Sequence, residues 1–98
     1  MIEIITPTLE FEWDSEKNNT NEVKHGIRFE DIVSVFNDIN RIELYDEEHS
    51  QNEDRYIVIG HVRHVIVVVY TIREPVIRII SARIATKAEE EAYYEGRI

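Results

Sequence analysis

The sequence predicts a small single-domain α+β fold with a mostly antiparallel β-sheet and three helices. Residues 64–85 contain two runs rich in Val and Ile on either side of a polar break at Pro75, a pattern typical of a β-hairpin. Apolar side chains recur at helical spacing in residues 29–38. Thr86 and Glu89 fit a capping box that opens a last helix. Because these strands and helices come in separate runs, a mostly antiparallel sheet is expected.

The chain opens with an extended lead-in over residues 2–8. Residues 9–13 then alternate apolar and acidic side chains, which predicts a short edge strand. Asp14 can cap a helix over residues 15–24, and Gly26 can end it as the residue after the C-cap.

The helix predicted over residues 15–24 is intrinsically weak, because Asn and Thr fill its middle. We therefore expect packing or a partner to hold it. Lys17, Asn21 and Lys24 recur at i, i+4 and i+7, so they are predicted to share one polar face. His25 follows at the C-terminal end of that face.

Residues 29–38 predict a second helix with one apolar stripe. The stripe consists of Phe29, Ile32, Val33 and Phe36, with Val35 and Ile39 at its edge. Strands are predicted over residues 41–45 and 56–60, separated by an exposed acidic loop over residues 46–54. A turn over residues 60–63 is expected to lead into the hairpin.

Both runs of the hairpin carry branched apolar side chains at consecutive positions, so we expect both faces of the sheet to be covered. Tyr70, Arg78 and Arg83 interrupt these runs. If the hairpin closes around residues 73–75, Tyr70 lies opposite Arg78. Arg78 and Arg83 are five residues apart, so they point to opposite faces unless a bulge intervenes.

Charge is unevenly spread along the chain, whose net charge is −9. Residues 1–54 hold four Lys or Arg against fifteen Asp or Glu, whereas residues 55–87 hold six against one. This distribution describes either an ordinary acidic surface or a basic region for phosphate beside an acidic region for a basic partner. The sequence has no Cys, no export signal and no long apolar run, so we expect a soluble cytoplasmic protein.

A series of short motifs runs from about Phe11 to the last helix. They are Phe11-Glu12-Trp13-Asp14, Lys17, Asn21, Lys24-His25-Gly26-Ile27, Phe29-Glu30-Asp31, Asp46, His49-Ser50, Glu53-Asp54-Arg55-Tyr56, Gly60, Val69-Tyr70-Thr71, Ile77-Arg78-Ile79-Ile80-Ser81-Ala82-Arg83 and Ala85-Thr86. In order and spacing this series resembles the BrnT family of toxins from type II toxin–antitoxin systems. Residues 1–10 lie outside the pattern as an N-terminal extension, and the last helix is acidic where such toxins usually carry a basic tail.

The resemblance implies a fold like that of the RelE ribonucleases and RNA cleavage without a metal or other cofactor. It also implies neutralisation by a BrnA-type antitoxin that binds DNA, so this chain would meet DNA only through its partner. A homodimer or a toxin–antitoxin heterotetramer is expected, with no membrane contact. The apolar strands agree with this, because a face left bare would be unusual on a monomer.

Cleaving RNA without a metal requires proton transfer and neutralisation of charge on the phosphate. His25 is the candidate catalytic acid or base, although a histidine at this position can simply cap helix carbonyls. Lys17, Lys24 and Tyr70 are candidate RNA-binding residues, Tyr70 by stacking on a base or by ordinary cross-strand packing.

Arg55, Arg78 and Arg83 are the candidate catalytic arginines, because guanidinium groups match phosphate oxygens. The alternative is that they form ion pairs with acidic residues. The acidic residues considered are Asp46, Glu53 and Asp54.

No metal-ligand motif is present, although His61 and His64 lie three residues apart and His49 lies in the acidic loop. Two functions therefore remain open. The chain is a toxin endoribonuclease, as the resemblance implies, or a non-catalytic module that only forms a complex with a DNA-binding partner. The acidic net charge favours the second function, because a ribonuclease must approach a polyanion.

Overall fold

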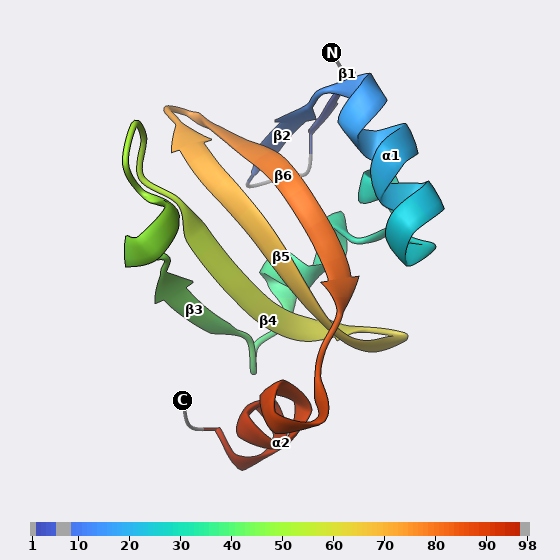
Figure 1. Ribbon diagram of the computed structural model, residues 1–98, viewed down its shortest axis with the longest axis vertical. Coiled ribbons are helices and arrows are strands. Elements are labelled where there is room, and N and C mark those ends of the chain that lie inside the picture. The colour runs from blue at the N-terminus through green and yellow to red at the C-terminus, as the bar shows by residue number, and fades with distance from the viewer. Residues whose placement is uncertain (1, 6–8, 97–98) are drawn as a thin grey trace.

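Six strands form one sheet in the structure, a computed structural model that describes residues 2–5 and 9–96 (Figure 1). They are β1 (Ile2–Ile5), β2 (Glu10–Trp13), β3 (Ile42–Tyr45), β4 (Tyr56–Val62), β5 (His64–Arg73) and β6 (Val76–Ile84). Their order across the sheet is β1-β2-β6-β5-β4-β3, and neighbours are antiparallel except for the parallel pair β2 and β6. The predicted α+β fold with a mostly antiparallel sheet is confirmed.

The N-terminal strand was wrongly predicted to lie at an edge. β2 lies between β1 and β6, with Phe11 opposite Ile77 in the parallel pair. β1 occupies the edge instead, within the segment predicted as a lead-in. Residues 6–8 of that lead-in lie outside the described residues.

The predicted turn over residues 60–63 is shorter in the structure, because β4 continues to Val62 and only Arg63 separates it from β5. Gly60 lies within β4, where it serves close packing rather than a turn. A Cβ atom at Gly60 would lie 2.6 Å from Cγ2 of Val35. The glycine therefore lets the chain that contains Val35 pack directly on the sheet.

A β-bulge changes the register of the central hairpin. Tyr70 lies opposite Ile79 and not opposite Arg78, as was predicted. Val69 pairs with Ser81, which leaves one extra residue, Ile80, in β6.

The bulge also decides which way the two arginines of β6 point. Arg78 is opposite Thr71 and Arg83 is opposite Val67, and these two β5 residues point to the same face. The arginines therefore share a face, which the sequence allowed only with a bulge. Tyr70 points to the other face.

Helical segments cover both faces of the sheet. The α1 face carries Ile66, Val68 and Tyr70, and lies under helix α1 (Ser15–His25) and the 3₁₀ helices η1 (Phe29–Asp31) and η2 (Val33–Asn37). The α2 face carries Val65, Val67 and Val69, and packs against Tyr93 of helix α2 (Lys87–Glu95). A further 3₁₀ helix, η3 (Glu47–His49), lies in the predicted acidic loop.

Figure 1 shows α1 beside β6 and α2 at the end of the sheet near β4. Within the described residues, no helix is both long and apolar enough to cross a membrane.

The helix predicted over residues 29–38 is two short 3₁₀ helices that meet at Ile32, where φ is −121° and ψ is 5°. Their backbone bonds span three residues, as in Val35 N to Ile32 O at 3.0 Å. Branched side chains here are poor α-helix formers, so the segment has little intrinsic preference for the predicted α-helix. The predicted stripe does face the core, but Ile39, predicted at its edge, is 91% exposed.

The first helix begins and ends at the predicted cap residues, but it packs differently from the prediction. Asp14 Oδ1 accepts from the N–H groups of Glu16 and Lys17, and Gly26 ends the helix with φ 71°. Asn21 does not share an exposed polar face with the lysines, because it is only 5% exposed and points to the sheet. Packing therefore holds this weak helix, through polar contacts.

The last helix begins with the predicted capping box. Thr86 Oγ1 accepts from Glu89 N over 3.2 Å, and Thr86 N donates to Glu89 Oε1 over 2.8 Å. The hydroxyl of Tyr93 in this helix donates a hydrogen bond to Asp38 Oδ2 over 2.6 Å, which links the helix to the residue after η2. Burial, together with the Asp38 carboxylate, raises the pKa of Tyr93 to about 12.

Candidate functional site

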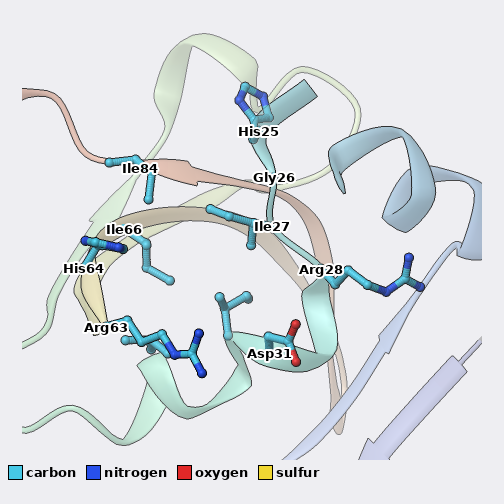
Figure 2. A pocket seen from close by; sticks show the side chains of 11 residues that line it. His25, Gly26, Ile27, Arg28, Asp31, Arg63, His64, Ile66 and Ile84 are labelled. Atoms are coloured by element: carbon cyan, nitrogen blue, oxygen red, sulfur yellow. The ribbon is translucent and has the colours of Figure 1, made fainter. Parts of the chain in front are cut away.

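A cleft of about 470 Å³ lies where the end of α1 faces the turn between β4 and β5 (Figure 2). Its lining comes from α1 and the loop after it, from η1 and from the ends of β4, β5 and β6. The lining residues are His25, Gly26, Ile27, Arg28, Asp31, Ile32, Val62, Arg63, His64, Ile66 and Ile84.

Gly26 and Asn21 shape the side of the cleft that belongs to α1. The left-handed backbone of Gly26 (φ 71°) turns the chain after His25, so that His25 and Ile27 both line the cleft. Asn21 Nδ2 donates to Ile27 O over 2.9 Å and fixes the returning loop. The position of His25 therefore depends on how α1 packs on the sheet.

Arg63 forms the opposite side, in an unusual backbone conformation. Val62 and His64 are paired with each other, so Arg63 alone makes the turn, with φ 65°. A residue other than glycine in this left-handed region costs about 1 kcal/mol or more. Such residues are often found at functional sites. The tight turn brings Arg63 and His64 to the rim of the cleft.

The cleft has an apolar floor beneath a polar rim. Ile66 is almost fully buried at 1% exposed, whereas Ile84 is 48% exposed where β6 ends. Figure 2 shows Ile27 between His25 on one side and Asp31 on the other. Such a mixture of apolar surface and a few polar groups is typical of ligand sites.

Most of the polar rim has no internal partner. Within the described residues, no side-chain hydrogen bond or ion pair involves His25, Arg63 or His64, and all three side chains are exposed. Arg28 differs, because its NH1 contacts Glu22 at 2.8 Å and its Nε contacts Glu30 at 3.2 Å. Hydrogen bonds to these carboxylates raise the pKa of Arg28.

The rim can therefore exchange protons and bind an anion. An imidazole is the side chain that most readily gives and takes a proton near neutral pH, and two imidazoles line one cleft. A guanidinium group offers a fork of donors to phosphate oxygens. These are the groups that RNA cleavage needs when no metal takes part.

Residues 13–89 match a family model described as the ribonuclease toxin BrnT of type II toxin–antitoxin systems. The chain belongs to the BrnT family. The matched segment includes every residue that lines the cleft. The family consists of toxin ribonucleases and implies an antitoxin as partner, so the resemblance predicted from the sequence is confirmed.

The structure is also similar to the crystal structure of the Brucella abortus ribonuclease toxin BrnT. The TM-score is 0.62 and the sequence identity 26%, and the match covers 79% of this chain and 96% of that one. No curated protein matches the chain.

The sequence-predicted site residues of this BrnT-family chain do not form one cluster. His25 lines the cleft, while Lys17 and Lys24 are exposed elsewhere on α1. Arg55 lies in a second hollow of about 500 Å³, next to β4. The residues that line it are Glu48, His49, Gln51, Asn52, Glu53, Arg55 and Arg73.

Arg78 and Arg83 form ion pairs on the α2 face. Arg78 NH1 lies 2.8 Å from Glu12 Oε2, and each of these side chains is 14% exposed. Arg83 makes two contacts with Glu89, of 2.7 and 2.9 Å. Both arginines thus form ion pairs, but with Glu12 and Glu89 and not with the acidic residues considered, and their catalytic role stays a prediction.

Tyr70 lies in the core against η2, at 5% exposed. Its ring stacks on Tyr56 with centroids 5.7 Å apart and meets the edge of Phe36 at 5.0 Å. Burial, followed by the nearby Glu43 carboxylate, raises the pKa of Tyr70 to about 12. Its predicted stacking on an RNA base stays a prediction.

Sequence reasoning missed Arg63, His64 and Asp31 as members of the site. His64 was considered only as a metal ligand, and Arg63 lay inside a predicted turn. Arg63 and His64 lie far from His25 in the sequence, and only the fold brings them to the same cleft. Among the described residues, no group of three or more His, Asp or Glu side chains is arranged to hold a metal ion.

Proposed function

We propose that this chain is a metal-independent endoribonuclease that cuts RNA in the cleft of His25, Arg63 and His64. One observation carries the proposal: two imidazoles and a guanidinium group without internal partners line the same cleft of a chain from a ribonuclease family. Cleavage of cellular RNA would inhibit translation and would take place in the cytoplasm.

The reaction that suits these groups is attack by a ribose 2′-hydroxyl on the adjacent phosphorus. One neutral imidazole takes the proton of that hydroxyl, and the bond from phosphorus to the 5′-oxygen breaks. The second imidazole, protonated, gives its proton to the departing oxygen. Arg63 stabilises the negative charge that builds on the phosphate. The products are a 2′,3′-cyclic phosphate and a 5′-hydroxyl end.

The natural partner in this proposal is a BrnA-type antitoxin, in a heterotetramer with two copies of each protein. α2 covers only part of its face of the sheet, where Ile57 and Val69 stay partly exposed. Residues 1–54 carry most of the negative charge, which suits a basic segment of the antitoxin. Binding is expected to silence RNA cleavage. Titration with the neighbouring gene's product tests this, with light scattering to measure the assembly and an RNA cleavage assay to measure the silencing.

RNA cleavage by the purified chain in EDTA tests the enzymatic proposal. We expect cleavage that leaves cyclic phosphate ends, and a loss of about 10²-fold or more in His25→Ala, His64→Ala and Arg63→Ala. His61→Ala is the matched control, since His61 is exposed on β4, close to Arg63 and His64 in the sequence, but does not line the cleft. The site is wrong if all three variants cut at the parental rate.

The second candidate function is a non-catalytic module that only binds a partner, which the net charge of −9 favours. A chain that never cuts RNA but still binds the antitoxin would establish it. The same assay should include Arg55→Ala, Arg78→Ala and Arg83→Ala. These arginines were predicted to be catalytic, although none of them lines the cleft. A loss of cutting in these variants alone would move the site to the α2 face or the second hollow.

A further inference from the structure

Asp31 is the one acidic side chain that lines the proposed RNA cleft in the described part of the chain. It is exposed, and its carboxylate makes no hydrogen bond or ion pair within the described residues. Its neighbour Glu30 differs, because Glu30 accepts from Asn18 at 2.8 Å and from Arg28 at 3.2 Å. Asp31 is therefore not explained by the packing of η1.

A carboxylate in this position does not suit a phosphate, which it would repel. It can only accept hydrogen bonds, so its partner in a bound RNA must be a donor. Figure 2 places Asp31 across the cleft from His25, with the apolar floor between them. A ligand that spans the cleft would thus meet the His25 imidazole at one side, apolar surface in the middle and the Asp31 carboxylate at the other side.

A nucleobase fits the middle and the far side of this arrangement. Its flat ring can lie on Ile27, which is partly exposed, and its edge can reach Asp31. Guanine presents two adjacent donors, N1–H and the N2 amino group, which match the two oxygens of one carboxylate. Adenine and cytosine present one amino donor beside a ring acceptor, and uracil presents one donor between two carbonyls.

We propose that the cleft binds a guanine base of single-stranded RNA, with the Asp31 carboxylate accepting from N1–H and N2–H. The strand must be single, because base pairing would occupy the same edge of guanine. The proposal rests on the proposed function, since it names the base beside the phosphate that His25, Arg63 and His64 act on. Cleavage should therefore occur next to guanosine.

The test compares unstructured oligonucleotides that differ at one position, which holds guanosine, inosine, adenosine, cytidine or uridine. For the parent chain we expect cutting at guanosine to be roughly tenfold to a hundredfold faster than at adenosine, cytidine or uridine. Inosine lacks the N2 amino group, so its cleavage rate should lie between that of guanosine and those of the other three nucleosides. Asp31→Asn should lose most of the ratio between guanosine and adenosine, and Glu91→Gln, an exposed change on α2, should keep it.

Equal cutting of all five oligonucleotides by the parent would overturn the proposal, and so would a full guanosine preference in Asp31→Asn. A uniform loss in Asp31→Asn without a change of ratio would also overturn it, because Asp31 would then act equally on every base and recognise none. If the parent cuts nothing, the proposed function fails, and binding of 2′-O-methyl oligonucleotides decides the base site. A guanosine preference in binding that Asp31→Asn removes supports it, and no preference overturns it.

Discussion

Asn21 of α1 pairs with the main chain of Ala82 in β6 as a neighbouring strand would. Its Nδ2 donates to Ala82 O over 2.9 Å, and its Oδ1 accepts from Ala82 N over 3.0 Å. β2 covers β6 only from Val76 to Arg78, so these groups of Ala82 would otherwise be buried without partners. A side-chain amide thus takes the place of a strand.

Asn21→Ala should be strongly destabilising. The change removes three hydrogen bonds, including one to Ile27 O, and leaves both polar main-chain groups of Ala82 unpaired. Each unsatisfied buried group costs about 1–3 kcal/mol, so we expect the free energy of unfolding to fall by about 2–4 kcal/mol. Urea unfolding followed by circular dichroism measures it.

Thr20→Ala is the control for this prediction, because Thr20 is the preceding residue of α1 and is exposed. It should change the free energy of unfolding by no more than about 0.5 kcal/mol. Equal unfolding midpoints for the two variants would show that α1 does not depend on Asn21.

Local patterns explain which parts of the fold could be predicted. The caps at Asp14 and Thr86 depend on side chains within three residues, and both occur as predicted. The strands of the hairpin follow from runs of branched residues, whose preference for a pleated surface is local too.

Features that depend on distant contacts could not be predicted. No sequence pattern marks the position of the bulge at Ile80, yet the bulge moves Tyr70 and Arg78 to opposite faces. Burial of Asn18 and Asn21 is invisible in a helix that looks polar throughout, because their partners lie in η1 and β6. The cleft escaped prediction for the same reason, since its rim comes from elements far apart in the chain.

Gly60→Ala should destabilise the fold by about 1–3 kcal/mol. The new Cβ would lie 2.6 Å from Cγ2 of the fully buried Val35, so η2 or β4 must shift. Thermal unfolding of the single variants and of Gly60→Ala with Val35→Ala gives the coupling energy. The double variant should be more stable than the sum of the single changes predicts, and simple additivity would contradict the contact.

The ion pair between Arg83 and Glu89 should make stability depend on pH in acid. Hydrogen bonds from Arg83 and from Thr86 N lower the pKa of Glu89 from 4.5 to about 2, against the effect of burial. A folded-state pKa below the unfolded value adds stability above about pH 4.5, and this is lost as the pH falls toward about 2. The pair is partly exposed, so solvent screening limits its contribution to about 1 kcal/mol.

Glu89→Gln is the variant that tests this pH dependence. It should be less stable than the parent at pH 7 by about 1 kcal/mol, and the difference should shrink between about pH 4.5 and 2. Denaturant unfolding at a series of pH values measures the difference, with Glu91→Gln as the control. A difference that stays constant over that range would show that the charge of Glu89 contributes nothing.

Arg63 combines a left-handed backbone with the phosphate-binding role proposed for its side chain, and Arg63→Gly separates the two. Glycine adopts a φ of 65° without a clash, so we expect the free energy of unfolding to stay level or rise by up to about 1 kcal/mol. RNA cleavage should nevertheless fall by about 10²-fold, because the guanidinium group is lost. Calorimetry and the EDTA cleavage assay measure the two effects on one sample, and Arg63→Lys shows whether charge alone suffices. A glycine variant that cuts RNA at the parental rate would remove Arg63 from the mechanism, and a large loss of stability would mean that its side chain holds the turn.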